Sequence, residues 1–221
     1  MSRLRWFLLL TVLSSCWAQS SGIQNELYSA QTSAWLEDVI NEYKPLAEKD
    51  IQALKIIGIA YHQLALDEKN KASEQAVAYL ERYCSSASDD MLALAYLGSS
   101  YAMLARDSSV VYKKITYVNK GLAMLDKAVN SAGDNYQVRV IRASIAYSVP
   151  EMFDRKKMAF NDYLYLTTHF SLSVTHQSEF YYKLGVLADH EGNHSQAVEF
   201  FKKSISADDK SEWAKKSKGK L

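Results

Sequence analysis

Apolar residues recur at steps of three and four along the chain after about Ser21, and no stretch alternates steadily between apolar and polar positions. A step of three to four places apolar side chains on one face of an α-helix, whereas a half-buried strand needs a period of two. The pattern therefore predicts an all-α fold. The expected helices span residues 23–43, 46–66, 72–86, 88–105, 113–131, 135–149, 151–169, 175–190, 194–207 and 209–218.

Residues typical of helix ends lie between these segments. Pro45 and Pro150 stand at two breaks, where the missing N–H of proline and the restricted residue before it end one helix and allow the next to begin. Gly192 and Asn193 mark a third break, because glycine and asparagine are typical of helix C-termini and N-caps. The sequence therefore predicts helices joined by short turns.

The composition agrees with a folded helical chain. Apolar residues make up 48% of the 221 positions, and only 2 Pro and 8 Gly interrupt them. The 26 Lys and Arg residues nearly balance the 25 Asp and Glu residues, for a formal net charge of +1. Because this charge gives no general attraction to a polyanion, we expect no nucleic-acid partner.

The N-terminus has the pattern of a secretory signal peptide. Two arginines in "MSRLR" precede the apolar stretch Trp6–Leu13, and small residues follow. That stretch is far shorter than the roughly 20 residues that span a bilayer. Two processing sites are open: cleavage after Ala18, which removes residues 1–18, or a lipobox that removes 1–15 and lipidates Cys16. We therefore expect an exported protein, periplasmic or secreted, or alternatively a membrane-anchored lipoprotein; membrane association is expected only if Cys16 is lipidated.

Four segments of the chain begin in a similar way, roughly forty residues apart. They are Ile57-Gly58 with Tyr61, Leu97-Gly98 with Tyr101, the degenerate Arg142-Ala143, and Leu184-Gly185 with Ala188. Here the sequence resembles the tetratricopeptide repeat family, whose 34-residue helix-turn-helix has Leu-Gly in the first helix and Ala and Phe in the second. Residues 178–211 fit best, with Ala197 and Phe201 in the expected second-helix positions.

The resemblance implies a fold and a domain organisation. Helical hairpins of this family stack into a right-handed superhelical solenoid, in which small residues let paired helices approach closely. It implies an N-terminal helix at 23–45 followed by a repeat domain at 46–218.

The resemblance also implies a concave surface formed by the first helix of each hairpin. The side chains expected to contact a partner there are Lys55, Ile59, His62, Ser99, Met103, Val140, Ser144, Tyr147, Tyr182, Val186 and Asp189. The set of Lys and Asn residues with which some members hold a C-terminal carboxylate is absent, because Ile59 and Ser99 stand where Asn would be required.

Arg139 and Arg142 lie three residues apart in the largely apolar segment 135–149. One interpretation is a partly buried ion pair with Asp154 or Asp162 of the next helix. The other is that Arg142 contacts an anionic group of a ligand or partner peptide.

His190, Glu191 and His194 spell the H-E-x-x-H pattern of zinc proteases. Two histidines one turn apart on a continuous helix can bind one zinc ion while the glutamate acts on its water. The repeat frame instead places Gly192 and Asn193 in a turn inside the motif, which predicts exposed histidines and no metal site.

Three functions follow as hypotheses. The first is a non-catalytic exported scaffold, without a cofactor, that binds a protein or peptide partner in the cell envelope. The second is a small-ligand-binding or transport-accessory protein with a pocket beside Arg142. The third is a zinc hydrolase that uses His190, Glu191 and His194.

Overall fold

The computed structural model describes residues 23, 26–27, 32–67 and 72–221 of the chain. The predicted signal peptide and Cys16 lie outside the described residues. Within them, every regular element is a helix, which confirms the all-α prediction. None of the described helices is long and apolar enough to cross a membrane.

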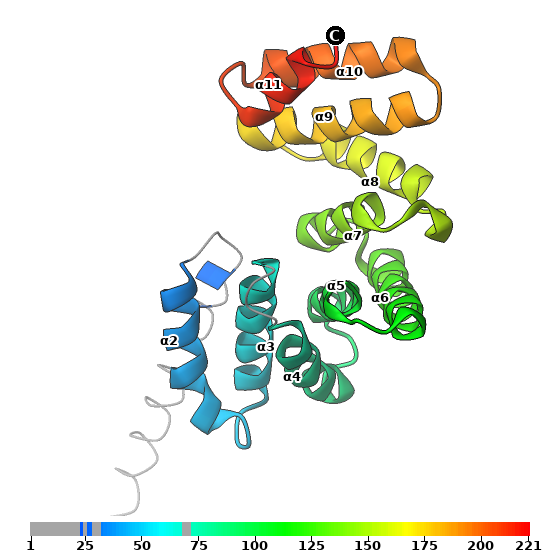
Figure 1. Ribbon diagram of the computed structural model, residues 1–221. Helices are drawn as coiled ribbons and strands as arrows, with labels where there is room; N and C mark the ends of the chain where they lie inside the picture. Colours follow the sequence, from blue (N-terminus) through cyan, green and yellow to red (C-terminus); the bar gives the residue numbers. More distant parts are fainter. Residues whose placement is uncertain (1–22, 24–25, 28–31, 68–71) are drawn as a thin grey trace, which may run out of the picture. The chain divides into compact units, whose positions relative to one another are not determined.

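The chain divides into two compact units, residues 1–117 and 118–221. The described part of the first unit comprises α2 (Ser33–Tyr43), the short 3₁₀ helix η1 (Lys44–Leu46), α3 (Ile51–Leu66), α4 (Ser73–Ser86), α5 (Met91–Asp107) and the beginning of α6 (Val111–Ala132). Helix α3 packs along α2 on one side and α4 on the other, and α4 in turn packs on α5 (Figure 1).

The second unit contains the rest of α6 and the helices that follow it. They are α7 (Tyr136–Ser148), the 3₁₀ helix η2 (Glu151–Phe153), α8 (Lys156–His169), α9 (Val174–His190), α10 (His194–Ala207) and α11 (Glu212–Lys218). Each helix from α7 to α10 packs on the next, and α11 covers both α9 and α10 (Figure 1). The second unit is therefore a row of helical hairpins, with a core formed by α7, α8, α9 and α10.

Most helices begin at a polar residue that caps the free backbone N–H groups. The side chains of Asp50, Asp90, Asn135, Ser173 and Ser211 accept hydrogen bonds from the first turns of α3, α5, α7, α9 and α11. Asn193 caps α10 in the same way, as the sequence predicts. These caps fix the start of each helix within the short turns between hairpins.

Three predicted boundaries differ from the structure by five residues or more. The helix expected at 23–43 is interrupted at Thr32, whose extended backbone and side-chain oxygen cap α2. The helix expected from residue 46 begins at Ile51, because Pro45 allows only the short turn η1 before the Asp50 cap. The helix expected at 151–169 begins at Lys156. Asp154, with a left-handed φ of 51°, separates it from η2.

Two glycines permit close contact inside the hairpins. A Cβ atom on Gly58 of α3 would lie 2.7 Å from Cγ of Leu80 on α4, and one on Gly185 of α9 would lie 2.5 Å from Cε1 of Phe201 on α10. Real Cβ atoms do not approach other atoms so closely. Leu80 and Phe201 are both buried, so the bare backbone of each glycine forms part of the core.

Candidate partner-binding face

The predicted groove residues of the first unit are buried in the structure. Ile59 is fully covered, and the exposed fractions of Lys55, His62, Ser99 and Met103 are between 5% and 8%. The ammonium of Lys55 forms an ion pair of 2.7 Å with Asp90, which also caps α5. In this arrangement these five side chains stabilise the packing of α3 and α5, and their contact with a partner stays a prediction.

His62 is the titratable group most affected by this burial. Its Nε2 atom lies 2.9 Å from the hydroxyl of Ser99, while Nδ1 is buried without a hydrogen-bond partner in the described part of the chain. Its ring packs edge-on against Tyr96. Burial lowers the pKa of His62 from 6.5 to about 3, so the imidazole is neutral at physiological pH.

The stability of the protein is therefore expected to fall on acidification. Below pH 6.5 the unfolded chain gains a proton at residue 62 that the folded chain does not take up until about pH 3. Each pH unit in this window lowers the free energy of unfolding by about 1.4 kcal/mol. Between pH 6.5 and pH 5 the loss from His62 is thus about 2 kcal/mol, measurable by urea denaturation.

A double variant serves as the comparison for this pH effect. His62→Leu with Ser99→Ala removes both hydrogen-bonding partners together, so neither side chain is left unsatisfied in the core. Its unfolding free energy should depend less steeply on pH than that of the wild type, whereas Val198→Ala, at an exposed position without a titratable group, should keep the wild-type slope. Equal slopes for all three proteins would refute the assignment.

The predicted groove residues of the second unit are accessible. Ser144 and Tyr147 of α7, and Tyr182 and Val186 of α9, are half-buried, as are Val140 and Asp189. Asp189 forms a 2.6 Å ion pair with His194 at the end of the hairpin. The residues predicted to line the groove are therefore buried in the first unit and partly exposed in the second.

A lysine surrounded by aromatic rings lies among these accessible residues. The ammonium of Lys183 lies 5.6 Å from the ring centre of Tyr147, 5.1 Å from that of Tyr163 and 5.8 Å from that of Trp213. The Trp213 ring in turn lies 5.5 Å from the ring of Tyr182. We call these five residues, together with Glu179, the Lys183 cluster. It joins side chains from α7, α8, α9 and α11.

Hydrogen bonds hold the charge of Lys183 in place. Its ammonium donates to Glu179 Oε1 at 2.6 Å and to the hydroxyl of Tyr163 at 3.1 Å. Burial by itself would lower the pKa of Lys183, but the interactions with Tyr163 and Glu179 outweigh it and raise the pKa above its usual value. Because the side chain of Lys183 is only 12% exposed, the cluster presents mainly aromatic surface with a cation just beneath it.

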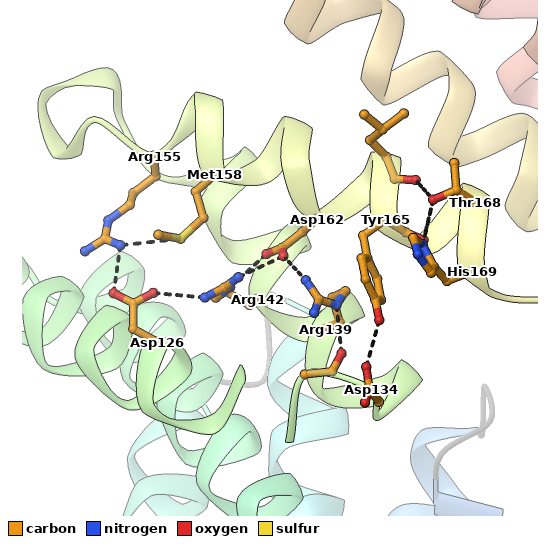
Figure 2. Close-up of polar contacts among 12 residues, drawn as sticks. Asp126, Asp134, Arg139, Arg142, Arg155, Met158, Asp162, Tyr165, Thr168 and His169 are labelled. Atoms are coloured by element: carbon orange, nitrogen blue, oxygen red, sulfur yellow. Dashed lines mark hydrogen bonds and ion pairs between the residues drawn. The ribbon is translucent and has the colours of Figure 1, made fainter. Parts of the chain in front are cut away.

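A second charged cluster lies between α6, α7 and α8 (Figure 2). Asp162, 1% exposed, accepts two hydrogen bonds of 2.8 Å from Arg142 and one of 2.8 Å from Arg139. Asp126 of α6 lies 3.6 Å from Arg142 and accepts a 2.8 Å hydrogen bond from Arg155. The structure thus shows the ion-pair interpretation of Arg139 and Arg142, and the guanidinium of Arg142 already has two carboxylate partners.

Asp162 is the acidic partner, and the alternative Asp154 lies exposed in a left-handed turn. Asp126 was not predicted as a member of this cluster, although its position in the sequence carried a signal. Asp126 stands between Leu122 and Val129 at helical spacing, on the face of α6 that is otherwise apolar. An acidic residue on a buried stripe indicates a buried cationic partner.

The H-E-x-x-H motif is interrupted as the repeat frame predicts. Helix α9 ends at His190 and α10 begins at His194, with Gly192 at a φ of 76° between them. The two histidines pair with different carboxylates, His190 with Glu151 and His194 with Asp189. The continuous helix that zinc binding by this motif requires is therefore missing at this place.

Lys183 and Trp213 were likewise not among the predicted site residues. Lys183 lies between Phe180 and Leu187, one residue before Leu184, on the buried side of α9. Trp213 belongs to a tail that its lysines mark as a solvated cap, yet its neighbour Ala214 is fully buried. An aromatic residue in an otherwise polar tail was the available signal that α11 packs on the repeat.

Comparisons with known proteins agree with this geometry. The family model described as tetratricopeptide repeat matches residues 178–211, which is the segment from α9 to the cap of α11. A search of curated proteins gives no significant match.

Two solved structures share the fold. TTC0263, a thermophilic TPR protein of Thermus thermophilus, is 14% identical over 82% of this chain and 88% of its own, with a TM-score of 0.59. MamA AMB-1 is 17% identical over 80% of this chain and 99% of its own, with a TM-score of 0.52. These likenesses confirm the predicted fold class of tetratricopeptide-type helical hairpins. Together with the match at 178–211, they show that this segment is similar to a tetratricopeptide repeat and that the helices share the fold of tetratricopeptide-repeat proteins.

Proposed function

We propose that this protein is a non-catalytic scaffold that holds a segment of a partner protein against the Lys183 cluster. Tetratricopeptide-repeat proteins are generally scaffolds of this kind, with contact surfaces made by successive first helices. In this chain the corresponding helices are α7, α9 and α11.

The observation that carries the proposal is the exposed aromatic surface on these three helices. Tyr147, Tyr182 and Trp213 are each half-buried, so their rings are held in position by the core and still reach solvent. Tyrosine and tryptophan in such settings are the residues that contribute most to protein interfaces, because they add contact area at a small loss of conformational entropy. Ser144 and Val186 extend the same surface along α7 and α9.

Site-specific photo-cross-linking in the native cell tests the proposal. A photoreactive residue at Val186, on the proposed face, should form an adduct with a protein that is then identified by mass spectrometry. The matched control is Val198, a 37% exposed valine on α10. Absence of any adduct at Val186, or the same adducts at both positions, would refute the proposed face.

We further propose that the scaffold acts outside the cytoplasm, in the cell envelope or as a secreted protein. The support is the signal-peptide pattern of residues 1–18. Mass spectrometry of the mature protein distinguishes a free N-terminal Gln19 from an acylated Cys16. A protein that retains Met1 in its native host would contradict export.

A further inference from the structure

We propose that the segment bound by the Lys183 cluster contains prolines and lies in the extended polyproline II conformation. The inference rests on the proposed function and specifies its partner. It follows from the hydrogen-bonding groups that the face presents, from their charges, and from the peptide-binding modes that the structure excludes.

The face carries three hydrogen-bond donors that have no acceptor in the described part of the chain. In the described part of the chain, the hydroxyls of Tyr147 and Tyr182 and the indole N–H of Trp213 make no hydrogen bond, and all three residues are partly open to solvent. The carboxylates nearby are already used, because Glu179 accepts from Lys183 and Asp189 pairs with His194. A complementary partner should therefore supply an acceptor for the indole N–H, which only donates, and it can supply acceptors for the two hydroxyls, which donate as well as accept.

A polyproline II segment meets this requirement. Proline contributes a backbone carbonyl and no N–H group, and the polyproline II helix makes no internal hydrogen bonds, so its carbonyls point outward and free. Proline rings also pack flat against tyrosine and tryptophan. Because the conformation is fixed before binding, little conformational entropy is lost on contact.

The other common modes of peptide binding fit less well. Addition of a strand needs an open sheet edge, and the described residues contain no strand. A bound helix uses its own carbonyls internally and needs a continuous apolar groove, whereas this face is interrupted by the ammonium of Lys183 and by hydroxyl groups. Of these three modes, the extended, carbonyl-rich segment fits the face best.

Charge adds a further specification. Besides Lys183, the ammonium of Lys216 lies 4.0 Å from the ring centre of Trp213, on the outer side of α11. Lys183 pairs with Glu179 and Lys216 with Glu212, but a third ammonium, that of Lys156, lies 5.5 Å from the ring centre of Tyr147 and donates to a backbone carbonyl. This excess of ammonium groups beside the rings favours a segment without lysine or arginine near its prolines, because like charges would be brought together. An acidic flanking residue should strengthen binding.

Peptide display tests the inference on the full mature chain. A random peptide library is selected on the wild type and depleted on Trp213→Ala, so that only peptides dependent on the cluster remain. We expect enrichment of prolines at neighbouring or alternate positions and depletion of lysine and arginine. A fluorescent peptide of the selected sequence is then measured by anisotropy beside a version with its prolines replaced by alanine.

Hydroxyl deletions keep the test independent of folding defects. Tyr147→Phe and Tyr182→Phe remove one hydroxyl donor each. Each should lower the affinity for the proline peptide by about threefold to tenfold. Trp213→Ala should lower the affinity for this peptide by at least about tenfold. Tyr112→Phe, at a 68% exposed tyrosine of α6 in the first unit, should leave affinity unchanged.

The possible outcomes separate the two proposals. Proline-containing peptides that lose affinity in Tyr147→Phe and Tyr182→Phe support both. Peptides that depend on Trp213 but contain no preferred proline refute the inference and leave the scaffold function standing. Selection that yields no peptide dependent on Trp213 refutes the inference, and without an adduct at Val186 it refutes the proposed face too.

Discussion

Replacing Asp162 by alanine is expected to lower the free energy of unfolding by about 3–5 kcal/mol. The carboxylate is 1% exposed and accepts three hydrogen bonds from Arg139 and Arg142. Without this carboxylate, the positive charges of two poorly solvated guanidinium groups are no longer neutralised by Asp162. The cost of leaving these charges buried exceeds the net stability that the ion pairs themselves contribute. Urea denaturation followed by circular dichroism measures the loss.

Two further variants show whether charge compensation is the cause. Asp134→Ala removes an exposed carboxylate that accepts a hydrogen bond from Tyr165, and it should change stability by less than about 1 kcal/mol. The triple variant Arg139→Met, Arg142→Met, Asp162→Leu removes the charges together and should recover most of the loss. If Asp162→Ala is as stable as the wild type, the buried network does not have the role assigned to it.

Replacing Phe201 by alanine is expected to cost about 3–5 kcal/mol, because it empties the space between α9 and α10. The ring of Phe201 is 2% exposed and fills the gap above the bare backbone of Gly185. Gly185→Ala alone gains helix propensity but forces a methyl group into that ring, with a net loss expected at about 1–2 kcal/mol.

The two substitutions together form a double-mutant cycle. The alanine side chain at position 185 fits into the space that the ring leaves, so the double variant should be more stable than the sum of the single losses predicts by about 1–3 kcal/mol. Gly219→Ala, where an added Cβ would lie at an ordinary 3.4 Å, should have little effect. Strict additivity at 185 and 201 would mean that the helices do not meet there as closely as the structure shows.

The helical framework was readable from the sequence because it depends on local chemistry. Apolar spacing located the helices, and Pro45, Pro150 and Asn193 marked ends that the structure confirms. The small residues Gly58 and Gly185 indicated the close helix contacts, since their lack of a side chain has a purely steric meaning. The break at Thr32 was missed because the apolar pattern continues through it and the threonine cap is a weak signal.

The candidate face was predicted only in part, because it depends on which helix covers which. Repeat positions placed Tyr147 and Tyr182 on the expected groove, and both are partly exposed, but equivalent positions such as Ile59 and Ser99 are buried. Repeat frames describe an average hairpin and cannot show what packs against a particular one. Lys183 and Trp213 were missed for a related reason, since their meeting depends on the return of α11 onto α9.

The most direct test of the central claim is the side-chain resonance of Trp213. In protein labelled with ¹⁵N at tryptophan, the indole N–H signal of Trp213 is assigned from its loss in Trp213→Phe, and Trp35 of α2 provides an internal control. On addition of the partner segment found by cross-linking or display, we predict that the Trp213 signal shifts with the binding isotherm while that of Trp35 stays in place. An unchanged Trp213 signal at saturation would contradict the claim that partners bind at the Lys183 cluster.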